Sequence, residues 1–178
     1  KGYDLFGGAI LKILKKHNDW NALVIGDEPR EKLIFKHKNL NLLGFQPHRK
    51  VLKVLEKTSI AVACSKWQEP FGRTSLEASS RGCAVIISDR GGLPETITNG
   101  IIIRNLNVKS LFVAIDKLIK DKQKTIKIQE LSIKNFYLTD QYITNKIDDY
   151  RHKIFNSINF LINNTKPLNK LKILHVTN

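Results

Sequence analysis

The segment 65–78 carries two carboxylates, Glu69 and Glu77, with seven residues between them. A carboxylate accepts hydrogen bonds in pairs, which suits the vicinal hydroxyls of a ribose or a hexose. A structural interpretation competes with this one, because the positive end of a helix dipole favours acidic residues near a helix start. Residue types alone leave both interpretations open.

Gly72 lies between the two glutamates, at the expected start of a helix over Arg73–Arg81. Glycine lets a ligand approach the backbone closely. The N–H groups of Arg73, Thr74 and Ser75 have no partner within the helix and carry the positive end of its dipole. The segment therefore predicts a site for an anionic group such as phosphate, to which the Arg73 guanidinium adds a charge-assisted contact.

Three further loops that contain glycine follow expected strands: Gly26–Pro29, Gly44–Pro47 and Asp89–Glu95. The carboxyl ends of parallel strands meet at one edge of a sheet, where α/β proteins bind ligands. The Gly91–Gly92 pair allows positive φ and close ligand approach, and Glu95 caps or lines the site, although a bare turn explains the same residues. Four such loops on one edge favour a cofactor-sized cleft.

The elements that position these loops follow from glycine content and hydrophobic period. All ten glycines lie in the first hundred residues, where short apolar runs alternate with stretches of helical period. This pattern predicts an α/β fold with a Rossmann-like parallel sheet, helices on both faces and a helical C-terminal extension. The expected strands are Ala22–Ile25, Leu40–Leu43, Ile60–Cys64, Ala84–Ser88 and Ile101–Ile103. The expected helices of this part are Tyr3–His17, Arg30–Phe35, Arg49–Lys57, Arg73–Arg81 and Val108–Lys120. Gly7 and Gly8 are expected to let the first helix pack closely on the sheet.

We expect three regions: a Rossmann-like domain over 1–122, C-terminal helices over 123–163, and a linker with a strand-like segment over 164–178. The helices are expected near Lys124–Asn135 and Asp140–Ile162, with Thr139 or Asp140 as N-cap of the second. The strand-like run Leu171–Val176 is either the start of a following module or a strand that packs on this domain. The absence of methionine and the start at Lys1 suggest a chain cut at both ends from a larger protein.

Charge and motif content exclude several classes of protein. The net charge of +14 is spread along the chain, so it supports a general attraction to anionic partners rather than a nucleic-acid site. No apolar run approaches the roughly 18 residues that span a bilayer. The sequence has no Gly-x-Gly-x-x-Gly after a strand, no P-loop and no nucleophile elbow, and its histidines lack metal-ligand spacing. Cys64 and Cys83 stand in apolar runs and are predicted to be buried thiols of a reducing compartment.

Together, Glu69–Ala78, Arg81–Ser88 and Gly91–Glu95 resemble the C-terminal donor-binding domain of retaining glycosyltransferases of the GT-B fold, family 4 type, also called glycosyl transferases group 1. The signature of that family is two glutamates with seven residues between them. Lys1–Asp4, Leu23–Asp27 and Leu42–Phe45 also match, so that the resemblance covers about residues 1 to 150.

The resemblance implies a role for each matching position. Lys1 would contact the donor diphosphate, and the backbone of Gly72–Thr74 would hold the distal phosphate. Glu77 would bind the ribose hydroxyls, and Glu69 would contact the transferred sugar near its reacting face. Gly44 and Phe45 would border the base, mostly through backbone. Transfer in such enzymes proceeds with retention and requires no metal.

The resemblance implies a hexosyltransferase that uses a UDP-, GDP- or ADP-sugar and a saccharide or lipid-linked acceptor. Its expected partner is the acceptor domain of the same protein, and no nucleic acid is expected to bind. The expected location is the cytoplasm, with peripheral contact to the inner membrane surface. The family's arginine, on a strand that would precede Lys1, and the acceptor domain are absent here, so we expect no sugar transfer by the isolated chain. The alternative is a non-catalytic nucleotide or nucleotide-sugar binding module.

Overall fold

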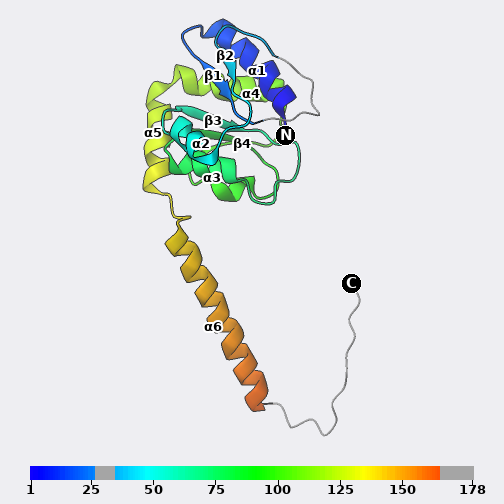
Figure 1. The fold of residues 1–178 in the computed structure, drawn as a ribbon, viewed down its shortest axis with the longest axis vertical. Coiled ribbons are helices and arrows are strands. Elements are labelled where there is room, and N and C mark those ends of the chain that lie inside the picture. Colours follow the sequence, from blue (N-terminus) through cyan, green and yellow to red (C-terminus); the bar gives the residue numbers. More distant parts are fainter. Residues whose placement is uncertain (27–34, 165–178) are drawn as a thin grey trace. The chain divides into compact units, whose positions relative to one another are not determined.

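The computed structural model describes residues 1–26 and 35–164 (Figure 1). The chain forms two compact units, Lys1–Phe136 and Tyr137–Asn178. Two sequence-based expectations lie outside the described residues: the helix over Arg30–Phe35, apart from Phe35 itself, and the strand-like segment Leu171–Val176.

The first unit alternates helices and parallel strands, which confirms the predicted α/β architecture. Its helices are α1 (Tyr3–Lys16), α2 (His48–Leu55), α3 (Arg73–Ser80), α4 (Val108–Lys120) and α5 (Lys122–Lys134), with a short 3₁₀ turn η1 (Leu93–Thr96). Its strands are β1 (Ala22–Val24), β2 (Leu40–Leu42), β3 (Ile60–Ala63), β4 (Ala84–Ser88) and β5 (Gly100–Ile103). The described part of the second unit contains the helix α6 (Asp140–Asn164). The Thr139 hydroxyl caps its first turn by accepting a hydrogen bond from the Tyr142 N–H at 3.2 Å.

The five strands form two groups within the described part of the chain. β1 pairs with β2, and β4 lies between β3 and β5, all in parallel. The edges of β1 and β3 face a cavity of about 430 Å³, whose lining comes from these two strands and from α1, α2 and α4. The expected single sheet is therefore interrupted between β1 and β3.

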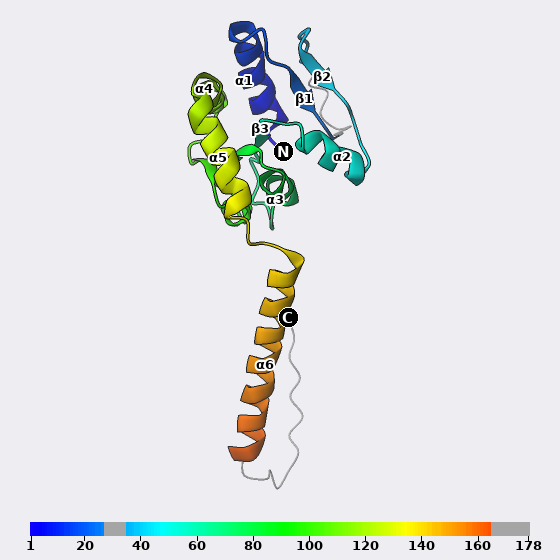
Figure 2. The same ribbon diagram turned by 90° about the vertical axis from the view of Figure 1, so that its left-hand side faces the viewer.

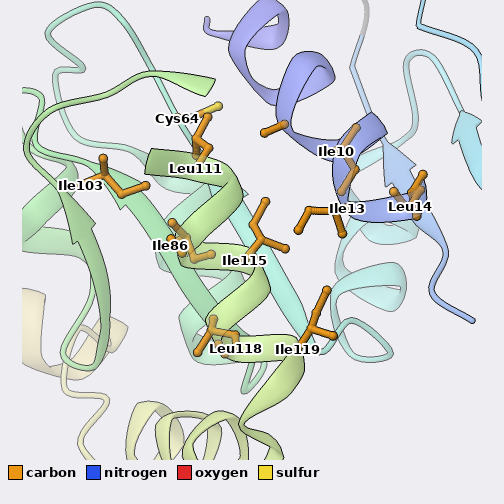
Figure 3. Close-up of a cluster of buried hydrophobic side chains, with 14 of the residues drawn as sticks. Ile10, Ile13, Leu14, Cys64, Ile86, Ile103, Leu111, Ile115, Leu118 and Ile119 are labelled. Atoms are coloured by element: carbon orange, nitrogen blue, oxygen red, sulfur yellow. The ribbon is translucent and has the colours of Figure 1, made fainter. Parts of the chain in front are cut away.

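Side chains of the central strand alternate between two hydrophobic cores. Ile86 packs with α1 and α4, which lie side by side on one face, and Figure 3 shows this cluster. Helices α2 and α3 lie side by side (Figure 2). On this other face Val85 and Ile87 pack with Leu55 of α2 and Ala78 of α3. Burial on both faces explains why β4 is an apolar run without alternation.

Gly7 and Gly8 were predicted to let α1 pack closely on the sheet, but the structure places other residues against them. A Cβ at Gly7 would collide with the ring of Phe35, and one at Gly8 would lie 3.1 Å from Val108. These glycines therefore bring α1 against Phe35 and the start of α4 rather than against the sheet. Cys64 and Cys83 are buried free thiols, as predicted, and burial raises the pKa of each to about 11.

The first compact unit extends to Phe136, beyond the boundary at residue 122 expected from the sequence. Helix α5 packs against α3, α4 and β4. The Gln129 side chain donates to the Ser59 carbonyl at 3.1 Å, and the Ser132 hydroxyl donates to the Asn99 carbonyl at 3.1 Å. In the described part of the chain, no helix is both long and apolar enough to cross a membrane.

Candidate donor site at the carboxyl edge of the sheet

A cavity of about 550 Å³ opens at the carboxyl ends of β1 and β3, beside the start of α3. Its lining includes five of the nine residues predicted from the sequence: Lys1, Glu69, Gly72, Arg73 and Thr74. The start of the chain and the segment 69–74 thus meet at the edge where α/β proteins bind ligands. The lining does not include the other four, Gly44, Phe45, Ser75 and Glu77.

The start of α3 offers unpaired backbone donors to this cavity. Gly72 has φ +96°, and a Cβ there would lie 2.6 Å from the Leu93 side chain, so a larger residue does not fit. The first helical hydrogen bond runs from the Leu76 N–H to the Gly72 carbonyl at 3.3 Å. No side chain caps the helix start. The three preceding N–H groups therefore stay available to an anion.

The Ser75 side chain has a structural task. It is 1% exposed, and its hydroxyl donates to the Gly72 carbonyl at 2.7 Å and contacts the Thr96 hydroxyl at 2.6 Å. The Thr96 hydroxyl oxygen also lies 2.7 Å from the Leu93 carbonyl oxygen. Ser75 therefore ties the start of α3 to η1, and only its backbone N–H serves the predicted phosphate site.

Lys1 and Glu69 both line the cavity and form an ion pair, with Nζ 3.6 Å from Oε1. Gly2 fixes this end of α1: it has φ +85°, and a Cβ there would collide with the Cys64 carbonyl. The Gly2 carbonyl also accepts from the Cys64 thiol at 3.4 Å. The chain therefore enters α1 directly beside the carboxyl end of β3, which places the exposed Lys1 ammonium at the site.

Glu77 lies outside the cavity lining but is connected to it through Arg73. Its Oε1 atom accepts from Nε and Nη2 of Arg73, both at 3.3 Å, and lies 2.9 Å from Nε2 of His48. Sequence reasoning missed His48, which begins α2 directly after the Gly44–Pro47 loop. The only local signal was its place at a strand-to-helix loop of the same sheet edge.

The predicted base-binding loop lies at the same edge as the cavity. The Gly44 carbonyl accepts from the Gly26 N–H at 2.9 Å, which joins the loops that follow β1 and β2. The neighbouring Phe45 is 79% exposed and so presents a free ring face. The contact between His48 and Glu77 brings the end of this loop to α3.

A second ion pair stands beside the entrance to α1. Lys66 donates to Asp4 at 3.0 Å. Burial acts to raise the pKa of Asp4, but the hydrogen bond and charge of Lys66 outweigh it and hold that pKa below its ordinary value. Among the residues that the structure describes, no group of three His, Cys, Asp or Glu side chains is arranged to hold a metal ion.

The model of the family "Glycosyl transferases group 1" matches residues 1–134, which include the whole site. The chain belongs to this family. One relative, the phosphatidylinositol N-acetylglucosaminyltransferase GPI3 subunit of Saccharomyces cerevisiae, is 33% identical over 128 residues, 67% of this chain. The chain spans 28% of the length of that relative.

Solved structures with the same fold include a protein of the group 1 family. The C-terminal domain of LpcC from Francisella tularensis is 30% identical, with a TM-score of 0.67 over 75% of this chain and 76% of that domain. Anabaena HepE, solved in complex with UDP-glucose, is 21% identical, with a TM-score of 0.57 over 72% of this chain and 41% of that one. The GT-B group 1 fold predicted from the sequence is confirmed.

Proposed function

We propose that this chain is the donor-binding domain of a retaining glycosyltransferase, which transfers a hexose from a nucleotide sugar to a saccharide or lipid-linked acceptor. One observation carries the proposal: Lys1, Glu69 and the open start of α3 meet in one cavity at the carboxyl edge of the sheet. Family membership supports sugar transfer, and the complex of the similarly folded HepE with UDP-glucose supports a nucleotide-sugar donor.

The arrangement of charges suits cleavage of a sugar–diphosphate bond. Negative charge grows on the departing diphosphate as that bond breaks, and fixed positive groups beside it lower the barrier. Lys1, Arg73 and the three N–H groups at the start of α3 supply such positive charge. We propose that they hold the diphosphate without a bound metal, so that EDTA leaves donor affinity unchanged.

Glu69 and Glu77 contact different parts of the donor. Glu69 lines the cavity beside Lys1, where it contacts the hydroxyls of the transferred sugar. Glu77 accepts from the ribose hydroxyls, while Arg73 and His48 hold its Oε1 atom. The Gly44–Phe45 loop borders the base.

We further propose that a strand preceding Lys1 fills the gap between β1 and β3. The Ser59 carbonyl accepts from the Ala84 N–H, so alternation along β3 turns the Ile60 and Val62 backbone groups away from β4 and toward the gap. The gap has apolar lining, as a buried parallel strand requires. Such a strand ends where Lys1 begins, because Gly2 contacts Cys64 at the end of β3.

Titration of the full-length protein with UDP-, GDP- and ADP-sugars, by calorimetry or NMR, tests donor binding. We expect saturable binding of one class, with shifts at the amides of Arg73 and Thr74. Lack of binding by all three classes contradicts the proposal. A full-length protein that binds donors but shows no turnover is instead the non-catalytic binding module. Turnover that survives Glu69→Gln contradicts the proposed role of Glu69.

The acceptor and the membrane contact extend the same proposal. The yeast relative acts, by its name, on a phosphatidylinositol, which is a membrane lipid. A lipid-linked acceptor brings the enzyme to the cytoplasmic membrane surface, and a net charge of +14 favours contact with anionic lipids. Cosedimentation of the full-length protein with anionic vesicles, but not with neutral ones, is the expected result.

A further inference from the structure

The loop that carries Glu69 is fastened to the neighbouring loop at several points. The Ser88 hydroxyl donates to the Ser65 carbonyl at 2.7 Å, where the loop begins. The Gly91 N–H donates to Oε1 of Gln68 at 2.5 Å, and the Gly92 N–H donates to the Glu69 carbonyl at 2.7 Å. The Gly91–Gly92 pair therefore binds the Gln68 side chain and the Glu69 carbonyl.

Both glycines are required by this contact. Gly91 has φ +56°, and a Cβ there would collide with the Glu69 backbone. A Cβ at Gly92 would lie 2.7 Å from the Pro70 carbonyl oxygen. The close approach that the sequence predicted for a ligand is thus made by the chain itself.

The loop 89–96 is also held at its other end. Thr96 contacts the buried Ser75 hydroxyl at 2.6 Å, and Ser75 belongs to the first turn of α3. The same loop therefore touches the start of α3 through Thr96 and the Glu69 backbone through Gly92. It joins the proposed phosphate site to the proposed sugar contact by short hydrogen bonds.

We propose that Gln68 is a positioning residue for Glu69: its side-chain oxygen, bound by the Gly91 N–H, sets the Glu69 carboxylate against the sugar of the donor. This role rests on the proposed function. Of the two hydrogen bonds from the glycine pair to the Glu69 loop, the one from the Gly91 N–H is accepted by a side chain, that of Gln68. Without that acceptor, the Gly91 N–H loses its partner, and of the two hydrogen bonds from the glycine pair only the one to the Glu69 carbonyl remains.

The test compares two substitutions in the full-length protein. Gln68→Met keeps the length of the side chain but lacks a strong acceptor, whereas Gln68→Glu keeps an oxygen that the Gly91 N–H can reach. Gln123→Met, on the exposed surface of α5, controls for the exchange itself. Calorimetry measures the affinity for the nucleoside diphosphate and for the matching nucleotide sugar, and amide exchange at Gly91 is measured beside it.

We expect Gln68→Met to lower the affinity for the nucleotide sugar about fivefold and to leave that for the nucleoside diphosphate unchanged. Exchange at Gly91 should be faster in Gln68→Met, whereas Gln68→Glu and Gln123→Met should behave as the unchanged protein. Equal affinities in Gln68→Met and the unchanged protein, or equal losses for both ligands, overturn the role of Gln68. If the unchanged protein binds neither ligand, the proposed function itself fails. This result differs from failure of the role of Gln68, in which the unchanged protein binds both ligands.

Discussion

Arg73 and Glu77 contact each other across one turn of α3, with Nε and Nη2 of the guanidinium each 3.3 Å from the same carboxylate oxygen. Arg73 also lines the cavity, whereas Glu77 does not. The cation proposed for the diphosphate and the carboxylate proposed for the ribose are therefore coupled. Losing either one leaves the other without its charged partner.

Glu77→Gln should reduce the preference of the protein for a ribonucleotide over its 2′-deoxy counterpart. The amide keeps the shape of the side chain but has only one acceptor oxygen, which Arg73 and His48 already contact. We expect a fall in the ratio of the two affinities of about fivefold by calorimetry. Glu130→Gln on α5 is the matched control, and an unchanged ratio in Glu77→Gln would exclude ribose recognition by this residue.

Glu69→Gln should abolish sugar transfer by the full-length enzyme and leave the affinity for the nucleoside diphosphate nearly intact. Glu69 lines the cavity, but the phosphate donors at the start of α3 do not depend on its charge. Steady-state turnover and calorimetric titration measure the two effects separately. Parallel loss of both would mean that Glu69 holds the site together rather than contacting the sugar.

Asp116 should make stability depend on acid pH. It lies 2.7 Å from His17 and 3.0 Å from Lys16, contacts that join the end of α1 to α4, and 3.1 Å from Lys120 on α4 itself. The hydrogen bond with His17 first, and then those with Lys16 and Lys120, hold the pKa of Asp116 below its ordinary value in spite of burial. A lowered folded pKa stabilises the fold above the unfolded pKa, and this stabilisation is lost as pH falls below about 4.

Asp116→Asn removes that dependence. We expect the free energy of unfolding at pH 7 to fall by about 1–3 kcal/mol, as for hydrogen bonds to charged groups, and the loss to shrink as pH falls below 4. Urea denaturation at pH 7 and pH 3 measures both values, and Asp148→Asn on α6 serves as control. A loss that is the same at both pH values would contradict the ion-pair explanation.

The strand proposed to precede Lys1 should protect two specific amides. The N–H groups of Ile60 and Val62 face the gap, whereas those of Ala61 and Ala63 face β4. Hydrogen exchange at Ile60 and Val62 should be at least about tenfold slower in the full-length protein than in the 178-residue chain. Exchange at Ala61 should change less between the two proteins. If none of the three amides exchanges more slowly in the full-length protein, the upstream residues do not form this strand.

The sequence by itself determined the local features of the site. The strands, the start of α3 at Gly72–Arg73 and the spacing of Glu69 and Glu77 follow from hydrophobic period and glycine, which act over a few residues. Parallel strands then place the loops at one edge by topology alone. This is why the predicted strand ends lie within one or two residues of the observed ones.

The tertiary structure decided which groups meet across long stretches of chain. The Gly91–Gly92 pair receives the Glu69 loop instead of a ligand, Ser75 turns inward to Thr96, and His48 reaches Glu77. None of these contacts has a local period or spacing, because each depends on how two helices or loops pack in space. For the same reason the gap between β1 and β3 could not be read from the strands themselves: an edge left open is a property of the assembled sheet.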